Sequence, residues 1–420
     1  MNKIISIIAL LLILPIFKVE AYDFVIDEIT YNFTKEHGTV EVSGLREFLN
    51  LEPGDRNSSL PLVVNIPPVV TYKDNKYDVV SIGYAAFQGC RKVTEIKIPS
   101  TVREIGEFAF ENCSKLEIIN IPDSVKMIGR CTFSGCYALK SILLPLMLKS
   151  IGVEAFKGCD FKEITIPEGV TVIGDEAFAT CESLEYVSLP DSMETLHNGL
   201  FSGCGKLKSI KLPRNLKIIR DYCFAECILL ENMEFPNSLY YLGDFALSKT
   251  GVKNIIIPDS FTELGKSVFY GCTDLESISI QNNKLRIGGS LFYNCSGLKK
   301  VIYGSVIVPE KTFYGCSSLT EVKLLDSVKF IGEEAFESCT SLVSIDLPYL
   351  VEEIGKRSFR GCTSLSNINF PLSLRKIGAN AFQGCINLKK VELPKRLEQY
   401  RYDFVFRSVE QPKITRNIQA

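Results

Sequence analysis

Thiol groups are the side chains of this sequence whose number and spacing could support chemistry. The chain has 15 cysteines, and most of them follow a phenylalanine by three positions. The cysteines of this set are Cys90, Cys113, Cys136, Cys159, Cys181, Cys204, Cys227, Cys272, Cys295, Cys316, Cys339, Cys362 and Cys385. Stacked thiols could bind a soft metal ion, and in an oxidising compartment they could pair as disulfides.

The spacing of these cysteines favours a structural role. One cysteine per repeat, always at the same register, is typical of a small buried residue whose S–H is a weak hydrogen-bond donor. The odd total also argues against systematic pairing. We therefore expect free, buried thiols and no metal site. Cys223 should be buried too, whereas Cys131 should be exposed because its equivalents are charged, namely Glu154, Glu176, Lys311, Glu334 and Arg357.

Residues with catalytic potential are scarce. His37 falls in a predicted turn and His197 replaces a repeat glycine, so both histidines are expected at the surface. Gly265-Lys266-Ser267 lacks the upstream glycine of a phosphate-binding loop, and no metalloprotease or serine hydrolase motif is present. The pairs Glu333-Glu334 and Glu352-Glu353 are typical of a solvated face. We expect no catalytic residue, no cofactor and no enzyme activity, and a hydrolase with an unrecognised site is the least favoured alternative.

The charge balance excludes a further class of protein. Lys plus Arg number 47 and Asp plus Glu number 49, which gives a net charge of −2. A dedicated nucleic-acid binder would carry a clear basic excess. No nucleic-acid partner is therefore expected.

A repeat explains why the cysteines are periodic. The phenylalanines that precede them recur every 21 to 23 residues, except where Leu247 and Thr250 replace the pair. A repeat of this length is typical of a solenoid. In one turn, Ile119-Asn120-Ile121 predicts a short strand, which Pro122 ends because proline has no amide hydrogen. The glycine that follows Ile105 recurs in most turns and predicts either a positive φ or a place where only a hydrogen atom fits.

The energetics of one turn require the turns to stack. A single turn buries too few apolar side chains to offset the conformational entropy lost by its own backbone. Stacking adds hydrogen bonds between strands and buries both flat faces of each turn on its neighbours. The whole array is therefore expected to be a single domain built around one parallel sheet.

The repeated pattern resembles the BspA-type (treponemal) subclass of leucine-rich repeats. It reads Ile-Gly-x-x-Ala-Phe-x-x-Cys-x-x-Leu-x-x-Ile-x-Ile-Pro-x-x-Val and runs from Val79 to about Pro394. A strand ending at Pro67 and a hairpin at Asp74-Asn75 also resemble the segment that precedes the repeats in this family. The resemblance implies a right-handed leucine-rich-repeat superhelix with one parallel β-sheet on the concave face. It also implies a surface or secreted protein that binds host matrix proteins or other cell-surface partners, and no enzyme.

Four segments are expected along the chain. Residues 1–21 predict a signal peptide, because Lys3 precedes an apolar run and Val19-Glu20-Ala21 resembles a cleavage site. Residues 22–78 should form an N-terminal β-rich cap with a hairpin across Glu36-His37-Gly38, residues 79–395 a solenoid of about 14 repeats, and residues 396–420 a C-terminal cap and tail. The protein should be exported, either secreted or at the cell surface (periplasm or outer surface in a bacterium), with no membrane span.

The outward positions of the predicted strands are the candidate binding surface, because side chains alternate between the two faces of a strand. Apart from Tyr186, the apolar residues among them are Ile118, Leu143, Ile256 and Ile302. One aromatic residue does not make a stacking platform for sugars or bases. The candidate partner-binding residues surround that tyrosine and are Glu163, Thr165, Tyr186, Ser188, Ser209, Lys211, Asn232 and Glu234.

These features predict a protein that binds another macromolecule, with a protein as the expected partner. A mixed polar face with both charges suits a protein surface, and tyrosine is favoured at binding hot spots. Two alternatives stay open at this point. The strand face could be merely a soluble surface, and the chain could be a structural component of the cell envelope without a host ligand.

Overall fold

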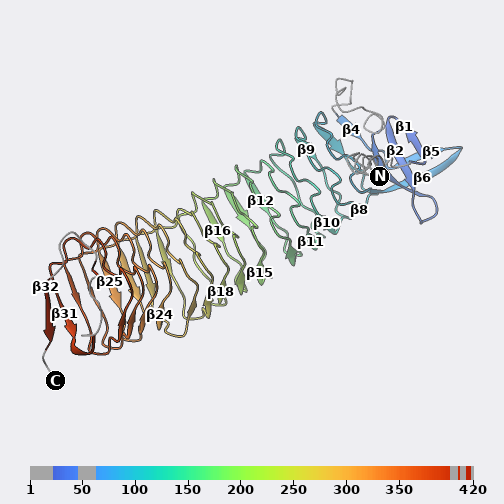
Figure 1. Cartoon of the computed structure of the whole chain (residues 1–420). Coiled ribbons are helices and arrows are strands. Elements are labelled where there is room, and N and C mark those ends of the chain that lie inside the picture. The colour runs from blue at the N-terminus through green and yellow to red at the C-terminus, as the bar shows by residue number, and fades with distance from the viewer. Residues whose placement is uncertain (1–21, 46–62, 398–404, 407–412, 418–420) are drawn as a thin grey trace, which may run out of the picture.

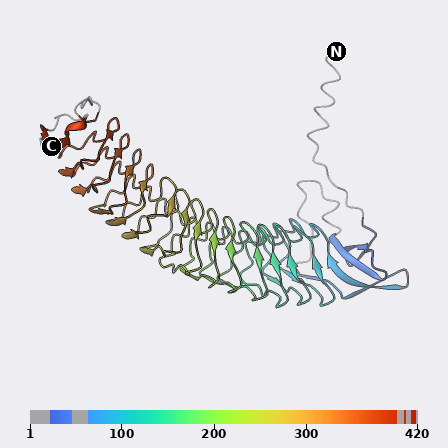
Figure 2. The same cartoon turned by 90° about the horizontal axis from the view of Figure 1, so that it is seen from below.

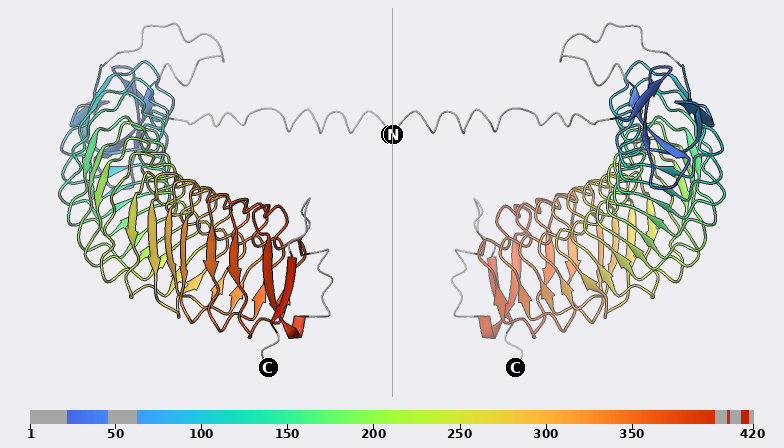
Figure 3. Two further views of the ribbon diagram at one scale, coloured as in Figure 1. Left: turned by 90° about the vertical axis from the view of Figure 1, so that its left-hand side faces the viewer. Right: turned by 90° about the vertical axis from the view of Figure 1, so that its right-hand side faces the viewer.

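The turns stack into one elongated, curved solenoid (Figure 1, Figure 2, Figure 3). The computed structural model describes residues 22–45, 63–397, 405–406 and 413–417. The predicted signal peptide, residues 1–21, lies outside the described residues, as does much of the predicted C-terminal segment. Within the described residues, no helix is long and apolar enough to cross a membrane.

The predicted strand recurs along the array and forms the first ladder. Neighbouring strands pair in parallel, for example Val187 with Ile210 and Ile345 with Ile368. Its strands are β4 (Val63–Asn65), β7 (Glu95–Lys97), β9 (Ile118–Ile119), β12 (Glu163–Thr165), β14 (Tyr186–Ser188), β16 (Ser209–Lys211), β19 (Asn254–Ile256), β21 (Ser277–Ile280), β23 (Lys300–Tyr303), β25 (Glu321–Leu324), β27 (Ser344–Asp346), β29 (Asn367–Asn369), β31 (Lys390–Pro394) and β32 (Lys413–Asn417).

Each turn also carries a two-residue strand at the isoleucine that precedes the repeat glycine. These strands form the second ladder: β8 (Glu104–Ile105), β10 (Met127–Ile128), β11 (Ser150–Ile151), β13 (Val172–Ile173), β15 (Thr195–Leu196), β17 (Ile218–Ile219), β18 (Tyr241–Leu242), β20 (Glu263–Leu264), β22 (Arg286–Ile287), β24 (Ile307–Val308), β26 (Phe330–Ile331), β28 (Glu353–Ile354) and β30 (Lys376–Ile377). The predicted parallel-sheet solenoid is confirmed. The expectation of one sheet is corrected to two ladders, each interrupted along its length.

A β-rich cap closes the N-terminal end. It contains β1 (Phe24–Ile26), β2 (Ile29–Phe33), β3 (Thr39–Leu45), β5 (Val69–Tyr72) and β6 (Asn75–Ile82). β2 and β3 pair antiparallel, as the predicted hairpin requires, and β3 then pairs in parallel with β6. Because β6 also pairs with β8, the cap continues directly into the second ladder.

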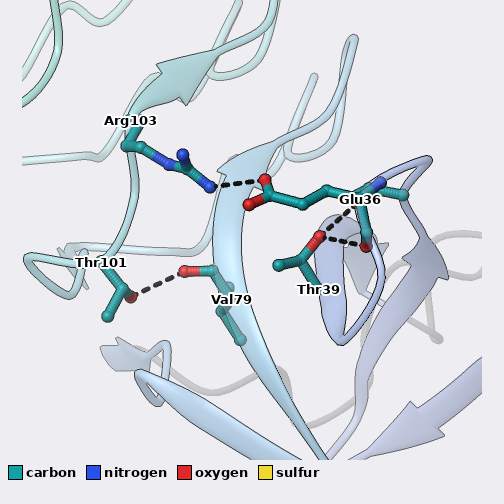
Figure 4. Close-up of polar contacts among 6 residues, drawn as sticks. Glu36, Thr39, Val79, Thr101 and Arg103 are labelled. Carbon is teal, nitrogen blue, oxygen red and sulfur yellow. Dashed lines mark hydrogen bonds and ion pairs between the residues drawn. The ribbon is translucent and has the colours of Figure 1, made fainter.

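Side chains fasten the cap to the first turns (Figure 4). The Arg103 guanidinium lies 2.8 Å from the Glu36 carboxylate, and the Thr101 hydroxyl donates to the Val79 carbonyl at 2.6 Å. Thr39 closes the hairpin turn by donating to the Glu36 carbonyl at 2.8 Å. The cap therefore continues the hydrogen bonding of the array, so the first turn does not end in unpaired strands.

The core is a column of phenylalanines at the centre of the solenoid. Rings from successive turns stack face to face, with centroid distances of 5.5 Å for Phe87 and Phe110 and 5.1 Å for Phe336 and Phe359. Leu247 takes one place in the column and is fully buried. Phe406 stacks on Phe382 at 5.3 Å, so the column extends past the last recognised repeat.

The repeat glycine is required by close packing between turns and not by a positive φ. Gly106 does not adopt a positive φ, but a Cβ on it would lie 2.6 Å from the backbone of Gly83 in the turn before. Only a hydrogen atom fits where successive turns approach so closely. The left-handed backbone occurs two residues later, at residues such as Cys131 (φ 51°) and Glu154 (φ 55°).

Candidate partner-binding surface

The structure brings the eight predicted surface residues together. Glu163, Tyr186 and Ser209 are register partners on β12, β14 and β16, and an isolated bridge from Ser209 to Asn232 extends their row. The second row contains Thr165, Ser188, Lys211 and Glu234. All eight side chains are exposed, so the predicted patch exists as a surface.

Tyr186 lies at the middle of this patch with a cation beside it. Its side chain is 47% exposed, and the Lys208 ammonium lies 5.9 Å from the ring centroid. Lys208 also bonds the Glu185 carboxylate, at 2.5 Å. This contact holds the pKa of Glu185 below its ordinary value and raises the pKa of Lys208. The ring is therefore supported on one side by a paired lysine and is open to solvent elsewhere.

The other predicted apolar positions of the face are also exposed, most of them strongly. Leu143 is 90% exposed and Ile256 is 83% exposed. Ile118 is exposed as well, whereas Ile302 is only half-buried. Large aliphatic side chains this open to water often mark contact surfaces when they lie together.

The ladder cysteines are free and buried, as predicted. Each thiol from Cys113 onward donates a hydrogen bond to the main-chain carbonyl of the Phe position one turn earlier, for example Cys136 to Phe110 at 3.2 Å and Cys339 to Phe313 at 3.1 Å. Burial raises the pKa of both Cys136 and Cys339. These two thiols thus act as neutral donors that join successive turns, whereas burial of Cys272 is outweighed by hydrogen bonds from Cys295 and Thr250, which lower its pKa.

Cys131 corrects one prediction. Its side chain is 3% exposed, although its equivalents in other turns are charged. Glu154, at the same position in the next turn, lies beside it. Its thiol lies 3.6 Å from the Glu154 carboxylate, and burial raises its pKa.

His197 lies beside a series of hydrogen bonds that joins successive turns. His197 Nδ1 lies 3.5 Å from Asp175 Oδ1. Asp175 accepts the backbone N–H of Asn198, and the Asn198 side chain accepts that of Asp221 in the next turn. Within the described residues, no group of three or more His, Cys, Asp and Glu could hold a metal ion.

Sequence reasoning missed an aromatic ladder elsewhere on the surface. Tyr270, Tyr293 and Tyr314 follow the core phenylalanines directly and stack at 5.3 and 4.6 Å. Tyr222 and Phe245 stack at 5.0 Å, and the Phe245 ring lies 6.0 Å from that of Tyr270 in a tilted contact. Stacking covers both faces of Tyr293, so this ring offers only its edge to a ligand. The signal was present in the sequence as aromatic residues one repeat apart.

These features are typical of a leucine-rich repeat: two short parallel strands per turn, a stacked phenylalanine column and a hydrogen bond from a thiol to the turn before it. A family model described as BspA type leucine rich repeat region, present in six copies, matches residues 71–185, 149–275, 194–308 and 306–419. The chain belongs to the BspA-type leucine-rich repeat family. The resemblance inferred from the repeated motif is thereby confirmed.

Solved structures of leucine-rich repeat proteins are similar to this one. A leucine-rich repeat protein from Bacteroides ovatus ATCC 8483 is 94% identical, with 94% of this chain and 100% of that chain covered and a TM-score of 0.89. A leucine rich cell surface protein from Faecalibacterium prausnitzii A2-165 is 24% identical, with 94% and 95% covered and a TM-score of 0.47. No curated protein matches the chain.

Proposed function

We propose that the protein is an exported binding protein that holds another protein against the outward face of its first ladder. The observation that carries the proposal is the patch on β12, β14 and β16, where Tyr186 projects from a sheet of small polar side chains. Tyrosine offers a large rigid area with a polar tip, which suits the centre of a protein interface. Host matrix or cell-surface proteins are the partner class that the family resemblance suggests.

The charges of the patch support a protein partner. Glu163, Lys211 and Glu234 form no ion pair with another described residue, whereas the nearby Glu185 is paired with Lys208. Unpaired charges of both signs on one face can be matched by complementary charges on a partner, which increases specificity and the rate of encounter. A face whose charges were already paired among themselves would offer less to recognise.

Binding of the purified protein to immobilised host extracellular matrix proteins and glycans tests this proposal. Tyr186→Ala should weaken binding to the retained protein by at least about 1 kcal/mol, which is roughly fivefold in Kd. Tyr349→Ala is the matched control, because Tyr349 is also an exposed tyrosine but lies outside the patch. Lys390→Ala, far along the array, should likewise have little effect.

Two results would contradict the proposal. Unchanged affinity of the double variant Tyr186→Ala, Lys211→Ala, with its circular dichroism intact, would remove the partner site from this patch. Self-association of the protein in sedimentation experiments, with no protein or glycan retained, would instead favour a structural envelope component.

A further inference from the structure

Two of the described turns of the first ladder carry no strand, and both precede a shortened connection, whereas the break between β29 and β31 separates two turns that each carry a strand. Residues 141–144 belong to no strand, and the turn at Asn232 contributes only an isolated bridge. In each case the next turn is one residue short before its strand. The strand isoleucine normally follows the cysteine position by six residues, as from Cys136 to Ile142, but by five from Cys159 to Ile164 and from Thr250 to Ile255. Because this connection is one residue shorter, we infer that the strand after it cannot pair in register with the preceding turn.

A groove lies on the outward face at each of these two turns, and a third, of about 470 Å³, lies over β23, β25 and β27 but is lined by Lys300 and Lys323. The first groove has a volume of about 590 Å³ and is lined by Ile118, Ile142 and Leu143 among others. The second has a volume of about 800 Å³ and is lined by residues that include Phe235 and Ile256. Ile142 and Phe235 are only partly buried, so the core itself is accessible at the floor of both grooves. The two most exposed aliphatic residues of the face, Leu143 and Ile256, therefore lie at the first two grooves.

Both grooves carry negative charge without a counterion. Glu117 and Asp123 line the first groove, Glu234 and Asp259 line the second, and no Lys or Arg lines either. None of the four carboxylates is in an ion pair with another residue in the described part of the chain. Elsewhere on the array, acids commonly pair with a base one turn away, as in Glu231–Lys253, Glu276–Lys299 and Glu353–Lys376. An apolar groove edged by unpaired carboxylates is complementary to an apolar side chain flanked by Lys or Arg, whose stems can also lie on apolar surface.

The spacing of the grooves fits one element that reaches both. Leu143 and Ile256 occupy the same row, five turns apart, which corresponds to about 24 Å at a strand spacing of about 4.8 Å. Between them lie β12, β14 and β16, whose backbone groups already pair with each other. A strand laid across this face would find no free backbone partners, whereas a helix satisfies its own hydrogen bonds. A helix of about 16 residues covers 24 Å.

We propose that the two grooves together bind a basic amphipathic helix of the partner protein. Apolar side chains at its two ends enter the grooves, and neighbouring Lys or Arg residues meet the four carboxylates. The inference rests on the proposed function, because Tyr186 and Lys211 lie between the grooves on the same face, and it names the element of the partner that the face would recognise. The helix-in-groove mode of recognition requires only this pattern of spaced apolar anchors.

Synthetic helical peptides test the inference directly. The probe carries two leucine pairs 14 residues apart on one face, about 21 Å at 1.5 Å per residue, with two lysines beside each pair. The control peptide has the same composition with the pairs seven residues apart, and a second control replaces every lysine with glutamate. Fluorescence anisotropy should show that the probe with its leucine pairs 14 residues apart binds at least tenfold more tightly than the control with its pairs seven residues apart. Only the wider spacing lets one peptide engage both grooves. The glutamate peptide should not bind.

Variants of the protein assign the binding to the grooves. Leu143→Ser or Ile256→Ser should each remove the advantage of the probe with the wider leucine spacing. The double variant Glu117→Gln, Asp259→Asn should weaken binding of that probe and reduce the salt dependence of its binding. Leu372→Ser is the matched control, because Leu372 is 63% exposed and lines neither groove. Equal binding of both peptide spacings, or binding unaffected by the Leu143 and Ile256 variants, would overturn the inference.

The inference and the proposed function can fail separately. If a matrix protein binds in a Tyr186-dependent way while the probe does not bind, the inference is wrong and the proposed function stands. If the probe binds through both grooves but no protein of the matrix panel binds, the inference stands and the proposed partner class is wrong.

Discussion

Removing one ring from the phenylalanine column should destabilise the array where the column is continuous. Phe336 is fully buried, and its ring stacks on those of Phe313 and Phe359 at 5.1 Å on each side. Phe→Ala substitutions in cores cost about 3–5 kcal/mol, mainly through the cavity they leave. Losing two stacked aromatic contacts, each worth roughly 0.5–1.5 kcal/mol, puts Phe336→Ala at the upper end of that range.

Phe224 supplies the internal comparison. It is also fully buried, but it has a ring partner on one side only, Phe201 at 5.6 Å, because Leu247 follows it in the column. We therefore expect Phe224→Ala to cost about 3 kcal/mol, at the lower end of the range. Because leucine already occupies this column at Leu247, Phe336→Leu should cost less than Phe336→Ala, about 1–2 kcal/mol.

Native-state amide hydrogen exchange is the suitable assay, because long repeat arrays do not unfold as one two-state unit. Protection should fall most in the turns next to residue 336, including β26 and β28, and little in the cap strands β2 and β3. Equal protection in Phe336→Ala and the parent protein, or a loss of the same size for Phe224→Ala and Phe336→Ala, would contradict the reasoning from stacking.

Three further predictions follow from the thiols and the glycines. A thiol reagent should label none of the described ladder cysteines quickly in the native protein, and Cys131, at 3% exposure, should react no faster than Cys339, whereas denatured protein should react at all 15; rapid native labelling counted by mass spectrometry would contradict this. Burial raises the pKa of Cys385 from 9.0 to about 12. Between these two pH values the thiol ionises only in the unfolded chain. The contribution of Cys385 to stability is therefore present below pH 9 and is lost as pH rises from 9 to 12, by about 1.4 kcal/mol per pH unit. Cys385→Ser should make the apparent urea midpoint less dependent on pH between pH 8 and 11, with the remaining dependence due to the other buried thiols. A Cβ on Gly355 would lie 2.5 Å from the Gly332 backbone, so Gly355→Ala should lower the melting temperature, whereas Gly89→Asn, at a φ of 75° with open space around it, should change it little.

Much of the architecture could be predicted because each turn repeats one local rule. The Phe and Cys registers, the short strand at Ile119 and the hairpin across the Glu36 turn each depend on residues close in sequence, although β9 ends at Ile119 and does not reach Pro122 as predicted. The candidate surface could also be predicted as a surface, because strand alternation alone determines which side chains point outward. Tyr186 and its seven companions are exposed and adjacent for that reason.

Features that depend on contact between turns could not be predicted in the same way. Cys131 is buried and lies beside Glu154, 23 positions away in the next turn, whereas single-turn reasoning compared it with charged equivalents instead. The role of the repeat glycine was left between two explanations, and the distance from Gly106 to the Gly83 backbone decided between them. The second ladder was missed because a two-residue strand has too little sequence to show alternation.

The sequence by itself determined the repeat, the solenoid class, the buried column and the outward rows, because these follow from periodicity and side-chain alternation within a turn. Only the tertiary structure decided where the first ladder loses its register, which carboxylates have no ion-pair partner and where the core is open to solvent. One missing residue before Ile164 or Ile255 is a small change in sequence, and in each case the preceding turn carries no strand and lines a groove. The reason is physical: pairing between turns requires backbone groups of two different turns to meet in register, and that condition involves residues more than twenty positions apart.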